Sequence, residues 1–255
     1  MIDKVDVIIC VKDPAQIRPK LLNCLNNADW VNNIILETSK PLALARIRAT
    51  EKCTTEWIAM FDDDVEIPDD WFDRIIARLR IRQIAGMDLI PEDVVAISTP
   101  DMSQIPDYYY MQLLSDRLFK LSKRDTPFID NCLFRKSALI GYDPPLAFYC
   151  EDEFFYEHVK KSGRWLHTDN IGVKHFYREK DAVYSGASQR VYKFESRWNV
   201  LRRLLVRTAM GPLVAIFYTH KLSTVKRFWN INYRFIIGWI FYNRYAVGIV
   251  EAKEV

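Results

Sequence analysis

The sequence lacks the features that mark secreted and disulfide-rich proteins. Its five cysteines are odd in number, are scattered along the chain and form no Cys-x-x-Cys pair. This use of cysteine suits a reducing cytosol and argues against a zinc site or a disulfide framework. Near the N-terminus Asp3, Lys4 and Asp6 interrupt the chain before any apolar run can build, so we expect no signal peptide.

Long apolar runs are also missing. In the C-terminal region Arg207 and Arg244 interrupt the apolar stretches well before eighteen residues, so no transmembrane helix is predicted. No internal repeat or low-complexity segment is present. The 255 residues are 49% hydrophobic and 27% charged, which is ordinary for a globular protein. This length allows one large domain or two small ones with a sizeable core.

Acidic residues are scarce in one part of the chain. From Ser185 to Val250 there are eleven Lys and Arg residues and a single acid, Glu195, so this segment carries a charge of +10. Because the whole chain carries +3, the remainder carries −7. Aromatic and aliphatic residues are interleaved with the basic ones, as in FIIGWIF at Phe235–Phe241. The sequence therefore predicts an acidic body and a basic, aromatic tail.

The stretch Trp57–Pro68 (WIAMFDDDVEIP) combines a buried strand with a run of acids. Its first five residues are mostly apolar and predict a strand, after which Asp62, Asp63 and Asp64 follow without a break. Carboxylates at the mouth of a sheet lie where α/β proteins bind ligands, and hard divalent cations take such oxygen ligands. The alternative is a solvated turn with a helix cap, since Pro68 and two further acids open a helix downstream.

Strands and helices alternate through the first hundred residues. Apolar runs predict strands, and apolar residues at helical spacing predict helices between them. The expected elements are strands at Val5–Val11, Ile34–Leu36, Trp57–Phe61 and Val94–Ser98, with helices near 17–25, 42–53 and 71–79. This β-α-β order indicates a doubly wound sheet with right-handed crossovers.

The following part of the chain is less regular. We expect a helix or strand at Asp107–Lys123, where core packing explains most of the tyrosines. The elements predicted beyond it are a strand at Phe128–Phe134, a short helix at Arg135–Leu139, a helix opened by Glu151, Asp152 and Glu153, and strands at Trp165–His167 and Ile171–His175. Acids in a first helical turn are also explained by the helix dipole alone. A histidine at a strand end is either structural or a ligand.

Taken together, these segments resemble the family 2 glycosyltransferases with a GT-A fold. The resemblance runs from about Val5 to Phe176 and rests on five motifs in family order: VDVIICVKD, ALARIRATEKCTTEWIAMFDDD, NCLFRKSAL, EDEFF and VKHF. It implies an α/β fold with a Rossmann-like, mostly parallel central sheet flanked by helices. We expect a catalytic domain at 1–184 and a helical, basic and aromatic extension at 185–255.

The resemblance also implies a donor site with a divalent metal, Mn²⁺ or Mg²⁺, held against the diphosphate of a nucleotide sugar. It assigns the nucleoside contact to Asp62 and the metal to Asp64. Asp63, which lies between them in the sequence, is also expected to contact the donor. His175 matches a histidine that completes the metal shell or touches the diphosphate. Residues expected around the nucleoside and phosphates are Val11, Lys12, Asp13, Glu37, Thr38 and Arg46. Glu37-Thr38 replaces the Asp-Asp pair that is common at the second strand.

The EDEFF motif matches the family's catalytic carboxylate, which falls on Asp152. Its expected role is to take the proton from the acceptor hydroxyl as that oxygen attacks the anomeric carbon. Attack opposite the leaving diphosphate inverts the configuration at that carbon. The resemblance places Asn131, Arg135 and Glu151 near the sugar or the acceptor.

The basic tail has three interpretations. Basic amphipathic helices with aromatic residues suit the surface of an anionic membrane. A helical subdomain packed on the catalytic core and an oligomer contact are the alternatives. We favour a peripheral position at the cytoplasmic face of a membrane. Nucleic acid is not an expected partner, because an acidic site would repel it.

The sequence therefore predicts an inverting, metal-dependent glycosyltransferase that uses a UDP- or GDP-type sugar and a lipid-linked or glycan acceptor. One rival is a metal-dependent nucleotidyltransferase or phosphohydrolase, which would use Asp62–Asp64 for two metals. The other is a non-catalytic, membrane-associated adaptor, against which intact Asp62, Asp64 and Asp152 argue.

Overall fold

The chain forms two compact units. The structure, a computed structural model, describes residues 2–80, 82–84, 87–99, 129–144, 151–168, 171, 173–176, 182–183, 186–187, 190, 196–219 and 222–242. The first unit comprises Met1–Gln104, Thr126–Pro145 and Glu151–Phe176, and the second comprises Ile105–Asp125, Leu146–Cys150 and Tyr177–Val255. The domain division at 184 and 185 stays a prediction.

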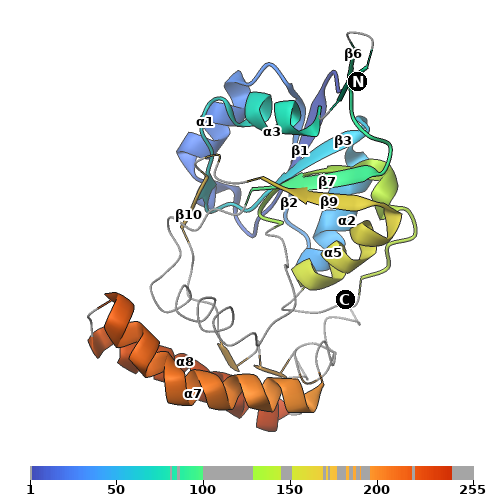
Figure 1. Cartoon of the computed structure of the whole chain (residues 1–255). Coiled ribbons are helices and arrows are strands. Elements are labelled where there is room, and N and C mark those ends of the chain that lie inside the picture. The colour runs from blue at the N-terminus through green and yellow to red at the C-terminus, as the bar shows by residue number, and fades with distance from the viewer. Residues whose placement is uncertain are drawn as a thin grey trace. The chain divides into compact units, whose positions relative to one another are not determined.

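A six-stranded sheet forms the centre of the first unit, in the order β2-β1-β3-β8-β7-β9 (Figure 1). Its strands are β1 (Val5–Cys10), β2 (Val31–Glu37), β3 (Trp57–Phe61), β7 (Val94–Ser98), β8 (Asn131–Arg135) and β9 (Arg164–His167). β8 runs antiparallel to both of its neighbours, β3 and β7, whereas the other neighbouring strands are parallel. The sheet is therefore mixed but mostly parallel, which confirms the predicted α/β architecture.

Helices cover both faces of this sheet (Figure 1). α1 (Pro19–Asn27) and α3 (Trp71–Leu79) pack on one face, and α2 (Leu42–Lys52) and α5 (Glu151–Ser162) pack on the other. Because side chains alternate along a strand, Val7 and Ile9 of β1 belong to the first core and Ile8 belongs to the second. The apolar spacing that predicted α3 is the face that it buries, namely Trp71, Phe72, Ile75, Ile76 and Leu79.

Shorter elements complete the first unit. β4 (Val65–Glu66) pairs antiparallel with β10 (Lys174–His175), and β5 (Arg82–Ile84) pairs antiparallel with β6 (Met87–Leu89). Two 3-10 turns, η1 (Pro14–Gln16) and η2 (Lys136–Leu139), lie in connections. The β4–β10 pair is important for the site because it sets His175 opposite Val65.

Most of these elements agree with the sequence-based expectations, and the differences are local. The strand expected at Ile34–Leu36 extends over Val31–Glu37. Among the described residues of the predicted strand Ile171–His175, Lys174–His175 form the observed strand. The sequence did not predict the β5–β6 hairpin or the reversed direction of β8. Asp107–Lys123 lies outside the described residues.

Two long helices account for most of the described part of the second unit. They are α7 (Arg197–Thr219) and α8 (Leu222–Ile240), which lie side by side (Figure 1). Gly211 of α7 meets the ring of Phe228, and a Cβ at this glycine would lie 2.2 Å from a ring atom. The indole N–H of Trp229 donates to the carbonyl of Thr208 at 3.2 Å. These contacts form an antiparallel helical hairpin and confirm the predicted helical extension.

Two further observations concern the described cysteines and helices. The cysteines that the structure describes, Cys10, Cys24, Cys53 and Cys132, are free. Burial raises the pKa of the Cys10 and Cys53 thiols to about 12, so neither is a thiolate near neutral pH. Among the described helices, none has the length and apolar character needed to cross a membrane.

Candidate functional site

The three consecutive acids emerge from the end of the central strand. Every residue of β3 is buried, and Phe61 at its end packs edge-on against Trp71 of α3, with ring centroids 4.9 Å apart. This packing fixes the strand end from which Asp62, Asp63 and Asp64 continue. The acids therefore lie at the carboxyl edge of the parallel strands β1 and β3, where ligands bind in open α/β sheets.

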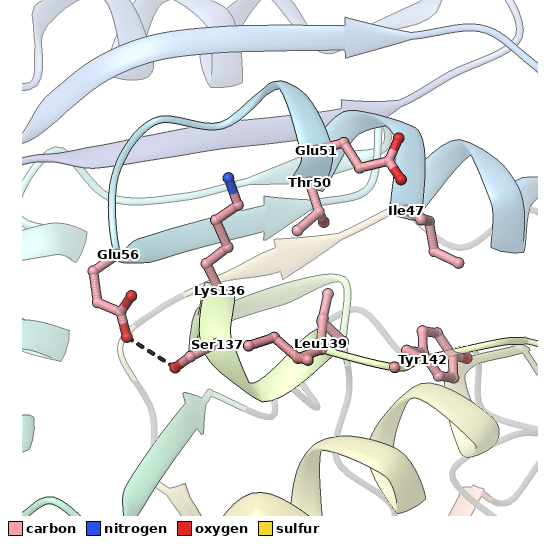
Figure 2. Close-up of a pocket in the computed structure, with 10 residues that line it drawn as sticks. Ile47, Thr50, Glu51, Glu56, Lys136, Ser137, Leu139 and Tyr142 are labelled. Carbon is pink, nitrogen blue, oxygen red and sulfur yellow. Dashed lines mark hydrogen bonds between the residues drawn. The ribbon is translucent and has the colours of Figure 1, made fainter.

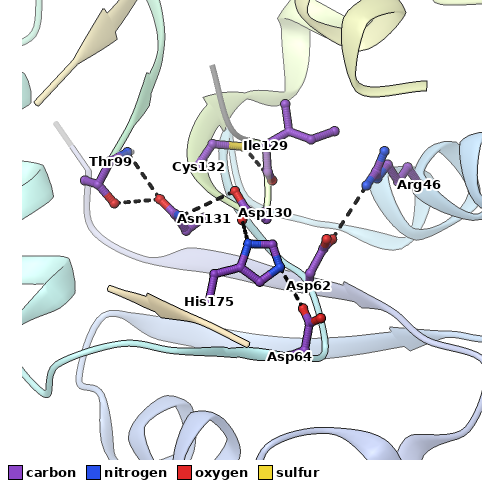
Figure 3. Close-up of polar contacts among 9 residues, drawn as sticks. All are labelled: Arg46, Asp62, Asp64, Thr99, Ile129, Asp130, Asn131, Cys132 and His175. Atoms are coloured by element: carbon purple, nitrogen blue, oxygen red, sulfur yellow. Dashed lines mark hydrogen bonds and ion pairs between the residues drawn. The ribbon is translucent and has the colours of Figure 1, made fainter. Parts of the chain in front are cut away.

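His175 lies beside these acids although it is distant from them in the sequence. The β4–β10 pair brings it there, and the amide of Phe176 donates to the carbonyl of Asp64 at 2.8 Å. Nε2 of His175 is 3.0 Å from Oδ1 of Asp64 (Figure 3). The structure thus brings together the two residues that the resemblance assigns to a metal.

Arg46 approaches the same acids from α2. Its residue surface is only 4% exposed, and Nη2 lies 3.6 Å from Oδ1 of Asp62 (Figure 3). A guanidinium keeps its positive charge even at this depth. The pairing holds a permanent positive charge beside the acids, and the assignment of Arg46 to a donor's base or phosphates stays a prediction.

Asp130 is a member of the cluster that sequence reasoning missed. It precedes β8, and the amide of Asp62 donates to its carbonyl at 3.1 Å. Its carboxylate oxygen Oδ2 is 2.5 Å from Nδ1 of His175 (Figure 3). The sequence does show an acid just before a predicted strand. The pairing of that strand with β3, which brings Asp130 to the site, cannot be predicted from a local sequence pattern.

The charges in this cluster influence one another strongly. Burial raises the pKa of Asp62 to about 6, and the carboxylates of Asp130 and Asp64 act in the same direction against Arg46. Burial alone would lower the pKa of His175, but hydrogen bonds and charges from Asp130 and Asp64 outweigh it and raise that pKa to about 10. The three carboxylates therefore outnumber the two cations around them, and a further cation would be attracted.

Asp62, Asp64 and His175 together offer ligand atoms that fit a divalent ion. Each offers one ligand atom, and these atoms all lie within 4.8 Å of one another. Carboxylate oxygens with one imidazole nitrogen suit Mn²⁺ and, with added water ligands, Mg²⁺. The side chains of Asp64 and His175 are 13% and 9% exposed, so two of the three are held rigidly by their surroundings.

The two predicted residues of β8 lie at opposite ends of that strand. Asn131 pairs with Phe61 and is at the acidic edge, where its Oδ1 accepts from the Thr99 hydroxyl at 2.6 Å. Arg135 pairs with Trp57 at the other edge and lies over its ring, 4.9 Å from the centroid. The structure therefore brings Asn131 to the cluster but not Arg135.

The predicted nucleoside-binding residues lie after β1 and β2, at the same edge as the acids. The amide of Val11 donates to the carbonyl of Glu37 at 3.0 Å and joins the two strand ends. Asp13 accepts from the Ala15 amide at 3.0 Å and caps η1. The Glu37 carboxylate is engaged by Lys52 at 2.6 Å, whereas Lys12 and Thr38 are exposed. Val11, Asp13 and Glu37 are thus engaged by contacts within the protein, and the role of all five residues in nucleoside binding stays a prediction.

α5 carries the predicted catalytic carboxylate in its first turn. Glu151 begins the helix, and Asp152 and Glu153 are partly buried. The far end of α5 is fixed where β7 begins, because the amide of Arg164 donates to the carbonyl of Asp93 at 2.6 Å. α5 packs against η2, β7 and β9, and the catalytic role of Asp152 stays a prediction.

A cavity of about 450 Å³ has none of the residues of this cluster in its lining. Figure 2 shows the residues that line it. Its wall comes from α2, from Glu56 before β3 and from η2 with the turn that follows. Within it, Lys136 donates to the Cys53 carbonyl at 2.6 Å and Ser137 donates to Glu56 at 2.9 Å. These hydrogen bonds engage three polar residues of the lining, Lys136, Ser137 and Glu56.

Comparison with known proteins gives one family match. The model of the family described as Glycosyl transferase family 2 matches residues 6–139, which is more than half of the chain. The matched region contains β1 to η2 and includes Asp62, Asp64 and Asp130. No curated protein sequence matches the chain significantly.

Solved structures share the fold at low sequence identity. A mannosyltransferase from Pyrobaculum calidifontis, in complex with GDP-Man and Mn²⁺, matches with a TM-score of 0.58 and 11% identity over 93% of this chain and 86% of its own. A glucosyl-3-phosphoglycerate synthase from Mycobacterium tuberculosis, in complex with Mn²⁺, UDP-glucose and phosphoglyceric acid, matches with a TM-score of 0.51 and 12% identity over 78% of this chain and 79% of its own.

Proposed function

Because the chain belongs to glycosyl transferase family 2, we propose that it transfers a sugar from a nucleoside diphosphate sugar, with inversion, to a hydroxyl or lipid phosphate. The observation that carries this proposal is the convergence of Asp62, Asp64 and His175 at one edge of the sheet. The two structural neighbours contain a nucleotide sugar and Mn²⁺, which supports a nucleotide-sugar donor and a divalent metal here.

Asp64 and His175 would hold the metal, with Asp62 completing the set or contacting the nucleoside. When bound, Mn²⁺ or Mg²⁺ supplies positive charge that stabilises the diphosphate leaving group. Arg46 adds a fixed positive charge beside Asp62, 3.6 Å from its carboxylate. Asp63, Val11, Lys12, Asp13, Glu37 and Thr38 would form the remainder of the donor pocket.

Asp152 would act as the general base. The acceptor hydroxyl gives its proton to the Asp152 carboxylate while its oxygen forms a bond to the anomeric carbon. The bond from that carbon to the diphosphate oxygen breaks at the same time, and the nucleoside diphosphate leaves with the electron pair. Support comes from the position of Asp152 in the first turn of α5, where it is partly buried, and from its match to the family's EDEFF motif. Asn131 and Glu151 would contact the sugar or the acceptor.

The second unit supports an acceptor that is presented at a membrane. On α7 one stripe of apolar side chains faces away from α8, with Trp198 69% and Leu205 61% exposed. The stripe recurs at helical spacing and consists of Trp198, Leu201, Leu205, Leu213 and Ile216. Neither α7 nor α8 contains an Asp or Glu residue, while Arg and Lys residues are exposed on both. An anionic lipid surface matches this combination of charge and apolar area.

We therefore propose that the enzyme works peripherally at the cytoplasmic face of a membrane, on a lipid-linked or glycan acceptor. Aromatic residues such as Trp198 and Trp229 suit the interface between lipid headgroups and acyl chains.

A donor screen tests the proposed reaction. The protein would be heated with Mn²⁺ and each of UDP-, GDP- and dTDP-sugars, and the preferred donor should raise the melting temperature only when the metal is present. Product analysis should then find a free nucleoside diphosphate. Release of a nucleoside monophosphate, or turnover of a nucleoside triphosphate, would instead identify the nucleotidyltransferase or phosphohydrolase rival.

A further inference from the structure

Asp130 is held in a fixed position next to the metal-binding histidine. Its side chain is only 7% exposed, and its backbone carbonyl accepts from the amide of Asp62 at 3.1 Å. The loop that carries Asp130 is thus tied to the loop that carries the acids. Its carboxylate faces Nδ1 of His175, on the opposite side of the ring from Asp64 (Figure 3).

The direction of the hydrogen bonds around Asp130 can be deduced from Thr99. A backbone N–H can only donate, and that of Thr99 reaches Oδ1 of Asn131 at 3.2 Å, while the Thr99 hydroxyl reaches the same atom at 2.6 Å. The oxygen of Asn131 therefore faces Thr99, and its amide nitrogen donates to Oδ1 of Asp130 at 3.4 Å. Oδ1 of Asp130 therefore accepts from Asn131, and Oδ2 of Asp130 faces Nδ1 of His175.

The direction of these hydrogen bonds determines which imidazole nitrogen of His175 can face a metal. The ring of His175 must lose one of its two protons before it can bind a cation. A carboxylate that faces Nδ1 keeps the remaining proton on that nitrogen, so the lone pair is on Nε2. Nε2 is the atom that lies 3.0 Å from Asp64, and both residues belong to the group that could hold a metal. Outer carboxylates of this kind orient a histidine ligand and fix its tautomer.

We infer that Asp130 is a positioning residue, which holds His175 with Nε2 toward the bound metal and is itself held by Asn131 and Thr99. The inference rests on the proposed metal-dependent function. It makes a specific statement about substitution by asparagine. In Asp130→Asn the amide oxygen would face the Asn131 donor, so the new NH₂ group would point at Nδ1 of His175. Nδ1 would then have to accept a hydrogen bond, and the ring proton would be on Nε2.

Mn²⁺ binding to the full chain tests this inference by calorimetry. Asp130→Asn, which is nearly isosteric, should weaken binding by about 10–100-fold, the usual effect of losing such an outer carboxylate. Asp130→Ala should weaken it less, because it imposes no tautomer. In a His175→Ala background Asp130→Asn should cause no further loss. In the Mg²⁺-loaded parent, ¹⁵N NMR should find the His175 proton on Nδ1.

The outcomes separate this inference from the proposed function. If the parent does not bind Mn²⁺, or if His175→Ala binds it as well as the parent, the proposed metal site is wrong. If His175→Ala weakens binding but Asp130→Asn does not, or if Asp130→Asn has its full effect without His175, only the positioning role is wrong. Should Asp130→Asn fail to fold, Asn131→Ala provides the test, since it removes the donor to Asp130, and unchanged Mn²⁺ affinity would overturn the inference.

Discussion

Gly163 lies directly against the carbonyl of Asp93, so that a Cβ on this glycine would be 2.4 Å from the carbonyl oxygen. The same Cβ would lie 2.6 Å from Cγ1 of Val95 in β7. Gly163 joins α5 to β9, and this close approach lets α5 turn back onto the sheet immediately after Ser162. The absence of a side chain at Gly163 therefore determines where α5 and its first-turn acids lie.

Gly163→Ala should destabilise the protein, because neither the backbone of Asp93 nor the buried Val95 can move without disturbing β7. We expect the free energy of unfolding in urea to fall by about 1–3 kcal/mol, the usual cost of overpacking. Ser162→Ala, a change at the exposed neighbouring position, is the control and should stay within about 0.5 kcal/mol. Equal stability of Gly163→Ala and the parent would contradict this account of the α5–β9 connection.

Asp64→Asn should abolish metal-dependent donor binding and leave the fold intact. The substitution removes a charged ligand from the proposed metal site. The strand and helix around Asp64 are held by apolar packing, which the substitution does not change. Calorimetry with Mn²⁺ and the preferred donor measures the effect. Asp69→Asn, at an exposed acid before α3, is the matched control and should bind as the parent does. Retained donor affinity in Asp64→Asn would remove Asp64 from the metal site.

Asp152→Asn should preserve donor and metal affinity but slow sugar transfer by about 10²–10⁴-fold, the contribution usual for a general base. An amide cannot take the acceptor's proton, yet it keeps the shape of the carboxylate. Glu153→Gln should have a much smaller effect, because consecutive residues on a helix point in different directions. Rates would be measured with saturating donor. Transfer at the parent rate, or loss of donor binding together with activity, would place the base elsewhere.

Glu37 should contribute to stability in a pH-dependent way. Hydrogen bonds from Lys52 and Ser39 lower the pKa of Glu37 from 4.5 to about 2. A carboxylate with a lowered pKa in the folded state stabilises the protein above its unfolded pKa, and this stabilisation is lost as the pH falls through the folded one. The stability difference between the parent and Glu37→Gln should therefore be full at pH 7 and shrink between about pH 4.5 and 2. Urea titrations at a series of pH values measure it, with Glu51→Gln at an exposed position of α2 as the control.

Replacing apolar side chains on the outer stripe of α7 should weaken membrane binding without changing the charge of the protein. Leu205→Ser with Leu213→Ser removes two side chains that are 61% and 48% exposed. Liposome flotation should show the loss, and binding of the parent should fall with salt and with neutral lipid, since each basic residue near the surface contributes about 1 kcal/mol. Equal recovery of parent and variant, or no flotation of the parent, would argue for a protein contact instead.

The sequence predicted local structure well because local apolar patterns carry that information. The buried strand before Asp62, the helix that begins at Glu151 and the amphipathic helix α3 were each expected from spacing and flanking residues. The family resemblance placed Asp64 and His175 in one site. Their contact depends on the β4–β10 pair, which is too short to be recognised from periodicity alone.

What the sequence could not provide is the arrangement of strands. Apolar alternation does not reveal strand direction, so the antiparallel β8 between β3 and β7 was not foreseen. That strand brings Asp130 and Asn131 to the acids and carries Arg135 to the opposite edge. Four residues of a strand span about 13 Å, which is why two residues of one motif can belong to different ends of the sheet.

The lack of carboxylates in α7 and α8 has a consequence for how their charge responds to conditions. Neither helix contains Asp, Glu, His or Cys, so the charged side chains on both helices are all Lys or Arg. Positive charge without an acid on either helix attracts anions, and salt screens this attraction. Any anionic partner of these helices must therefore control the strength of association through its own charge density and the ionic strength.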